Sequence, residues 1–195
     1  MFISLFQMTF FRNLNLFFCA IYAGLVLAVD VNLDIKPTLK NQKIQKEIIK
    51  KVKEDHFFKV NNIEEINNIF QEKLIESLDP SKVYFTKLEF EQYGNNLNEE
   101  IFDLNNSFKI LNKYFNRLIE ATSYQIGILE NFDFNFSKSE YMDVYADDNE
   151  WKSSFAELRK EWFLLTKNDL LNEILDEDLS NENEIKQTII DRYER

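Results

Sequence analysis

The longest regular pattern of apolar residues lies between residues 95 and 131. Its apolar side chains recur in alternating steps of four and three, at Leu97, Ile101, Leu104, Phe108, Leu111, Phe115 and Leu118, and the row continues through Thr122, Ile126 and Leu129. This spacing places them on one face of an α-helix. Polar residues lie off the row, at Asn98, Glu99, Asp103, Asn105, Asn112, Asn116 and Glu120. The pattern predicts a long central helix over 97–129, with its apolar face covered by other helices and its polar face in water.

Two helices and a turn are predicted before this segment. The first carries Ile44, Ile48, Ile49 and Val52 on one side. The second begins at an Asn62 cap, with Glu65 in capping-box spacing, and its inner row is Ile63, Ile66, Phe70, Leu74 and Leu78. Asp79-Pro80-Ser81 ends it, because proline cannot continue the helical hydrogen bonds.

A short helix is expected next, from the capping box of Thr86 and Glu89 to about Gly94. After Asn131 the pattern changes, because Phe132, Phe134 and Phe136 alternate with polar residues. We interpret this segment, which extends to Asp148, as an irregular aromatic strap that packs over a helix groove; a platform for stacking a ligand is the alternative.

Helical spacing resumes near the C-terminus. It includes Trp151, Phe155, Leu158, Trp162, Leu165, Leu171 and Leu175, with Asp148 and Asn149 placed to cap the helix, and a last helix carries Ile185, Ile189 and Tyr193. We therefore expect an all-α fold of about six helices, in which the 62–78 and 151–175 helices pack on the central one.

Composition supports this fold and narrows the partners. The chain has 195 residues, enough for one domain with a real core, and only 3 Gly and 2 Pro, which favours helices. Its net charge of −11 argues against nucleic acid as a partner. The cluster of Lys43, Lys46, Lys50, Lys51 and Lys53 is interpreted as a solvated helix face rather than a site for lipid or nucleic acid.

Catalytic and metal-binding patterns are missing from the sequence. His56 is the only histidine, and the only cysteine, Cys19, lies in the leader, so neither has the partners that a metal site needs. No phosphate loop or dinucleotide-binding turn is present. We expect no cofactor, no metal and no catalytic residue.

Residues 1–28 have the pattern of a secretory signal peptide. Arg12 precedes the apolar run Leu14 to Leu27, and Val26-Leu27-Ala28 forms a small-residue cleavage site. An uncleaved membrane anchor is the alternative, but the run is shorter than the roughly 20 residues that a span needs. We expect contact with a membrane only through this leader.

Several segments resemble, in the same order, the N-terminal helical domain of bacterial tail-specific (carboxy-terminal processing) proteases, a family of serine peptidases. His56-Phe57-Phe58-Lys59 resembles the entry into its second helix, and Leu78-Asp79-Pro80-Ser81-Lys82-Val83-Tyr84-Phe85 resembles its Leu-Asp-Pro-x-Arg-x-Tyr-Phe turn. The C-terminal matches are Trp151, Trp162, the run Asp169, Leu170 and Leu171, and the pair Arg192 and Tyr193. The resemblance covers residues 36–195.

The resemblance implies a part of an exported, ATP-independent endopeptidase that acts on proteins with apolar C-terminal tails. In the family, a PDZ domain and a domain with a Ser-Lys dyad follow the helical domain, and this sequence contains neither. The helical domain shapes the substrate chamber and in some members docks a lipoprotein adaptor. We therefore expect a periplasmic, non-catalytic domain that docks substrates or an adaptor; a stand-alone exported protein-binding module is the alternative.

The leader assignment predicts where the exported chain begins. Cleavage after Ala28 gives a mature N-terminus at Val29. N-terminal sequencing of the exported product is the measurement. A product that begins at Met1 or Met8 would show that the leader is retained.

Overall fold

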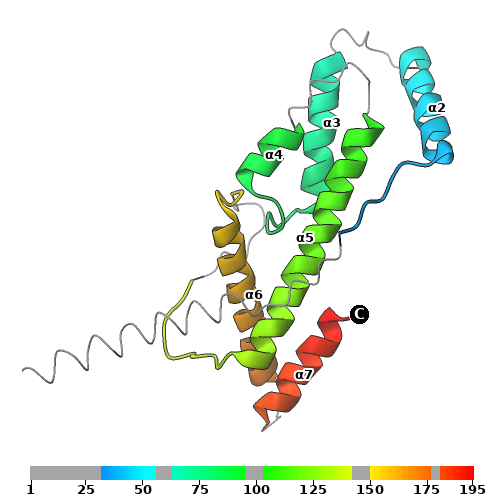
Figure 1. Ribbon diagram of the computed structural model, residues 1–195. Coiled ribbons are helices and arrows are strands. Elements are labelled where there is room, and N and C mark those ends of the chain that lie inside the picture. The colour runs from blue at the N-terminus through cyan, green and yellow to red at the C-terminus, as the bar shows by residue number, and fades with distance from the viewer. Residues whose placement is uncertain (1–31, 56–62, 95–102, 142–149, 177–180) are drawn as a thin grey trace, which may run out of the picture. The chain divides into compact units, whose positions relative to one another are not determined.

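The computed structural model describes residues 32–55, 63–94, 103–141, 150–176 and 181–195. Within these residues the fold is all-α, as predicted, with six helices and no strand (Figure 1). The helices are α2 (Leu39–Asp55), α3 (Ile63–Leu78), α4 (Lys87–Gly94), α5 (Leu104–Asn131), α6 (Phe155–Asp176) and α7 (Glu182–Tyr193).

The long helix α5 is central, as the sequence predicts. It packs against α3, α6 and α7, while α3 also packs against α4, and α6 against α7. Three groups of buried apolar residues follow from these contacts. They contain Ile75, Phe85 and Ile110; Ala121, Leu158 and Trp162; and Leu129, Leu170, Ile185, Ile189 and Ile190.

The start of α5 differs from the prediction. The helix begins at Leu104 and not at Leu97, because Asp103 is its N-cap and accepts hydrogen bonds from the backbone N–H groups of Asn105 at 2.9 Å and Asn106 at 3.1 Å. The predicted seam positions before residue 103 lie outside the described residues. The end of α5 at Asn131 lies two residues beyond the predicted one.

The buried face of α5 also differs from the prediction. The buried residues are Asn106, Ser107, Ile110, Arg117, Ala121 and Leu129, of which Leu129 alone belongs to the predicted seam. Asp103, assigned to the polar face, is 3% exposed. Hydrogen bonds make this burial possible, since Asn106 donates to Tyr93 O at 3.1 Å and Ser107 to Asp103 O at 2.8 Å.

Two asparagines of α5 that were predicted to face water instead hold an extended segment of the chain. Asn112 accepts from Ile35 N and donates to Ile35 O, both at 2.8 Å. Asn116 makes the same pair of bonds with Leu33, at 2.7 and 3.0 Å. Side chains four residues apart lie on one face of a helix, so the pair aligns residues 33–35 along α5.

The structure also corrects the helix that follows the strap. It begins at Phe155, and its capping residues are Ser154 and Glu157, with Glu157 N donating to Ser154 Oγ at 3.3 Å and Ser153 N donating to Glu157 at 2.8 Å. Trp151 therefore precedes the helix and is not part of it. The predicted caps Asp148 and Asn149 lie outside the described residues.

The inner rows of α3 and α6 are shifted as well. Among the α3 side chains that the structure describes, those of residues 68–78, Gln71 and Ile75 are fully buried, whereas the predicted Leu74 and Leu78 are partly buried. In α6 the buried row is Leu158, Trp162, Thr166 and Leu170, and the predicted Leu175 is 73% exposed. Thr166 is tolerated there because its hydroxyl donates to Trp162 O at 2.8 Å.

Glu89 connects α4 to α5. One oxygen accepts from Thr86 N at 2.8 Å, which confirms the capping box, and the other accepts from Arg117 at 2.8 Å and Lys113 at 2.5 Å. Arg117 also lies over the Phe155 ring, at 4.5 Å from its centroid. Partial burial of Glu89 raises its pKa, but the Lys113 hydrogen bond, the Thr86 N–H and the charge of Arg117 outweigh it, so the pKa is lowered.

This network predicts how stability depends on pH. A carboxyl group whose pKa is lowered in the folded state adds stability above its ordinary pKa and loses it as the pH falls through the folded value. Urea unfolding of wild type and Glu89→Gln should differ by about 1–3 kcal/mol at neutral pH, because a partly buried charged network loses a partner, and the difference should shrink in acid. Glu91→Gln, an exposed glutamate of the same helix, is the control. An unchanged difference in acid would contradict the assignment.

Candidate functional site

The turn between α3 and α4, residues 79–86, is built around the Asp79 carboxylate. Its oxygens accept from three successive backbone N–H groups, Val83 at 2.8 Å, Tyr84 at 2.8 Å and Phe85 at 3.0 Å. Lys82 has a φ of 55°, in the left-handed region that non-glycine residues rarely adopt. Asp79 is 1% exposed, and burial raises its pKa, while the N–H donors act in the opposite direction.

The same turn joins α6 and the segment before it. Trp162 Nε1 donates to Val83 O at 2.7 Å, although the two residues are 79 positions apart. The backbone of Lys87 donates to Lys152 O at 2.8 Å, next to an isolated parallel bridge between Thr86 and Lys152. The indole N–H is buried, so the bond fixes the position of the ring.

Aromatic rings fill the space around the turn. Phe85 stacks near Tyr114 with ring centroids 6.4 Å apart, and Trp151 contacts Phe85 edge-on at 6.4 Å and stacks on Phe90 at 4.8 Å. Tyr84 meets Tyr114 edge-on at 5.4 Å, and burial raises the pKa of Tyr84 to about 12. The turn therefore acts as a junction of α3, α4, α5 and α6.

A second group of residues joins α6 to α7. The hydroxyl of Tyr193 donates to Asp169 at 2.6 Å, and Arg192 forms an ion pair with Glu173 at 2.5 Å. Burial and then the bond to Asp169 raise the pKa of Tyr193. Leu170 is fully buried in a cluster with residues of α5 and α7, and Tyr193 packs against the same cluster.

The structure thus brings the residues singled out in the sequence into two groups. The first contains Leu78, Asp79, Pro80, Tyr84, Phe85, Trp151 and Trp162, and the second contains Asp169, Leu170, Arg192 and Tyr193. Leu171 lies apart from both groups, in a surface pocket, and His56 lies outside the described residues. Both groups have the contacts of helix junctions.

The aromatic strap packs on α6, as the sequence predicts. Phe163 of α6 contacts Phe132 edge-on at 5.3 Å and stacks on Phe134 at 5.7 Å. Lys186 of α7 donates to Phe132 O at 3.2 Å. In the strap, 46% of Phe132 remains exposed, so its outer side is open to solvent.

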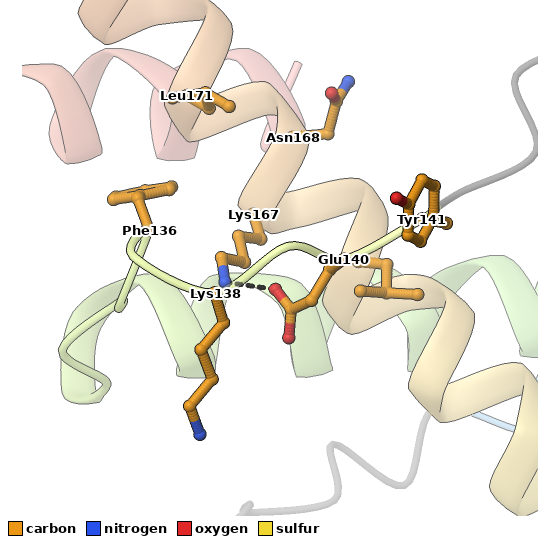
Figure 2. Close-up of a pocket in the computed structure, with 8 residues that line it drawn as sticks. Phe136, Lys138, Glu140, Tyr141, Lys167, Asn168 and Leu171 are labelled. Atoms are coloured by element: carbon orange, nitrogen blue, oxygen red, sulfur yellow. Dashed lines mark hydrogen bonds and ion pairs between the residues drawn. The ribbon is translucent and has the colours of Figure 1, made fainter.

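A surface pocket of about 130 Å³ lies where the strap crosses α6 (Figure 2). It is lined by Phe136, Lys138, Glu140, Tyr141, Leu164, Lys167, Asn168 and Leu171. Lys167 forms an ion pair with Glu140 and donates to Asn135 O at 2.6 Å, and so fixes the strap to the helix. Figure 2 shows Phe136 and Tyr141 on opposite sides of this pair. The lining is mixed, because Phe136, Tyr141, Leu164 and Leu171 are aromatic or aliphatic and the other four residues are charged or polar.

Comparison with known protein families identifies the domain. The family model described as tail specific protease N-terminal domain matches residues 48–195, most of the chain. The chain belongs to this family. A search of curated proteins finds no match.

The matched segment contains all the described residues of both groups and the pocket. In the described part of this tail specific protease N-terminal domain, no group of three or more His, Cys, Asp or Glu side chains is arranged to hold a metal ion. No helix among the described residues has the length and apolar character to cross a membrane.

Several important residues of this tail specific protease N-terminal domain were missed by the sequence analysis. Arg117 and Lys113 bind Glu89, and Gln71 donates to Asp103 O at 3.4 Å and to Ser107 at 3.5 Å. The sequence gives a weak indication for Arg117, because an arginine that is buried in a core helix needs a carboxylate partner. Nothing in the sequence indicates that Gln71 is buried.

The Asp79 junction predicts a large loss of stability on truncation. Asp79→Ala leaves three backbone N–H groups without their acceptor, which should cost about 2–5 kcal/mol, and Asp79→Asn should cost less because one oxygen remains. Urea unfolding followed by tryptophan fluorescence measures both. The exposed Asp133→Ala, in the strap, is the control. Equal stability of Asp79→Ala and wild type would contradict the role of the carboxylate.

Proposed function

We propose that this chain is the non-catalytic N-terminal domain of a periplasmic, ATP-independent serine endopeptidase that degrades or processes proteins from their C-terminal tails. The observation that carries the proposal is the family match over residues 48–195. The leader pattern of residues 1–28 supports export to the periplasm. The role of the domain in this proposal is to dock a protein substrate or an adaptor.

The strap pocket is the docking surface that we assign to the substrate. Its walls include Phe136, Leu164 and Leu171, which offer an apolar surface to an apolar tail. Tyr141 is 92% exposed at the rim, where a tyrosine contributes apolar area and a hydroxyl. The exposed Lys138 adds a positive charge for a terminal carboxylate.

A peptide-binding experiment tests this role. A fluorescent peptide that ends in apolar residues with a free carboxylate should bind the chain and raise its anisotropy. Phe136→Ser with Leu171→Ser should weaken binding at least about tenfold, because each removes apolar contact in the pocket. Leu175→Ser, on the same helix but outside the pocket lining, should bind as wild type does.

Two further observations decide the proposal. Mass spectrometry of the peptide after incubation should show it intact, and cleavage would overturn the non-catalytic assignment. Antibody capture from the source cell then gives the mass of the native polypeptide. A product several times heavier than 23.4 kDa supports a protease domain, and a product of that mass points to the stand-alone module.

A further inference from the structure

Helix α2 exposes an apolar stripe. Its residues Ile44 and Ile48, four positions apart, are 44% and 47% exposed. Leu39, at the first position of the helix, is 83% exposed but lies on another face. Among the described helices, α3 to α7 pack against one another, whereas α2 makes no extensive contact with any of them. Burying such residues would stabilise the helix, so a surface that accepts them is expected.

Lysines border this stripe. Lys40, Ile44, Ile48 and Lys51 are separated by four, four and three positions, so they follow one another along one face of the helix. Lys40 and Lys51 of this face are exposed, and the other α2 lysines whose side chains the structure describes, Lys43, Lys46 and Lys50, are exposed on other sides of the helix. From the sequence alone we interpreted the lysine cluster as a solvated helix face. The structure adds that two isoleucines, Ile44 and Ile48, are exposed on the same helix.

The charge of α2 is opposite to that of the rest of the chain. Residues 39–55 contain six lysines and three acids, a net charge of +3, and the total of −11 leaves −14 for the remainder. The Debye length is about 8 Å at physiological salt, so acidic groups farther away than this have little effect at the point where α2 makes contact. The positive charge of α2 itself, rather than the negative charge of the rest of the chain, then favours a negatively charged partner.

We propose that α2 binds an anionic lipid surface, with its isoleucines at the acyl boundary and its lysines among the headgroup phosphates. A helix with low overall hydropathy, a lysine-rich polar face and an apolar stripe lies in a membrane interface in this way. Lysine stems extend along the apolar layer while the ammonium groups stay in water. Nucleic acid offers phosphates but no apolar layer for Ile44 and Ile48.

This binding goes beyond the docking of proteins and requires no protease partner. Each lysine near an anionic surface raises partitioning about fivefold, so Lys40→Gln with Lys51→Gln should weaken the lipid contact of α2 by about 25-fold. The strap pocket is a different surface and involves neither residue. Failure of the lipid experiment would therefore leave the proposed function standing, and failure of the peptide experiment would leave this one standing.

The experiment uses the full chain with a local probe, because the leader is itself apolar. Cys19, the only cysteine, is replaced by serine, and an environment-sensitive fluorophore is attached at Ile48→Cys. The vesicles are phosphatidylcholine alone or phosphatidylcholine with phosphatidylglycerol. Leu175→Cys, 73% exposed on α6, carries the fluorophore in the matched control.

We expect the emission at position 48 to shift to the blue only with the anionic vesicles. The shift should disappear in high salt and when all six lysines of α2 are replaced by glutamine. The label at position 175 should not respond. Three results would overturn the proposal: no shift at position 48, an equal shift with neutral vesicles, or a shift that persists without the lysines. A shift that grows with protein concentration without vesicles would also overturn it, by showing that a second copy covers the stripe.

Discussion

The Asp79 carboxylate sets the position of the turn that joins α3 to α4 and contacts α5 and α6. A buried carboxylate is stable only where donors surround it, and here the donors are three successive backbone N–H groups. Their alignment curls residues 83–85 around the side chain. The curl turns the Val83 carbonyl toward Trp162 and places Phe85 among rings from α5 and the segment before α6. One side chain thus holds a turn that joins α3 to α4 and contacts both α5 and α6.

Much of the helix layout was predictable from sequence because its signals are local. The capping box of Thr86 and Glu89 and the Asp-Pro stop at residue 79 act over a few residues, and the structure has both features. The long row of apolar residues predicted helix α5, and it predicted the C-terminal end of this helix to within two residues. The strap was also predictable, because alternating phenylalanines cannot fit the period of a helix.

The buried faces were less predictable, because polar side chains fill part of them. Asn106, Ser107 and Arg117 are polar and lie outside the predicted apolar row, yet each has a partner inside the fold. The partners of Asn106 and Arg117 belong to α4, and no local spacing reveals them, whereas Ser107 bonds to Asp103 at the cap of its own helix. Hydrogen bonds and ion pairs with other segments determine which polar side chains are buried. The buried face of α5 therefore differs from the apolar face that the sequence predicts. The strap pocket was missed for the same reason, since it needs α6 beside the strap.

The bond between Trp162 and Val83 has a consequence for the order of folding. Its two ends are 79 residues apart, and the loop that it closes contains all of α5. Closing a long loop loses chain entropy before any contact is gained, so α3, α4 and their local caps form sooner than this junction. During synthesis from the N-terminus, the turn emerges with Phe85 uncovered until α5 and Trp151 follow, and with the Val83 carbonyl unpaired until α6 follows. For that interval a folding chaperone has an apolar surface to bind, which the finished domain hides.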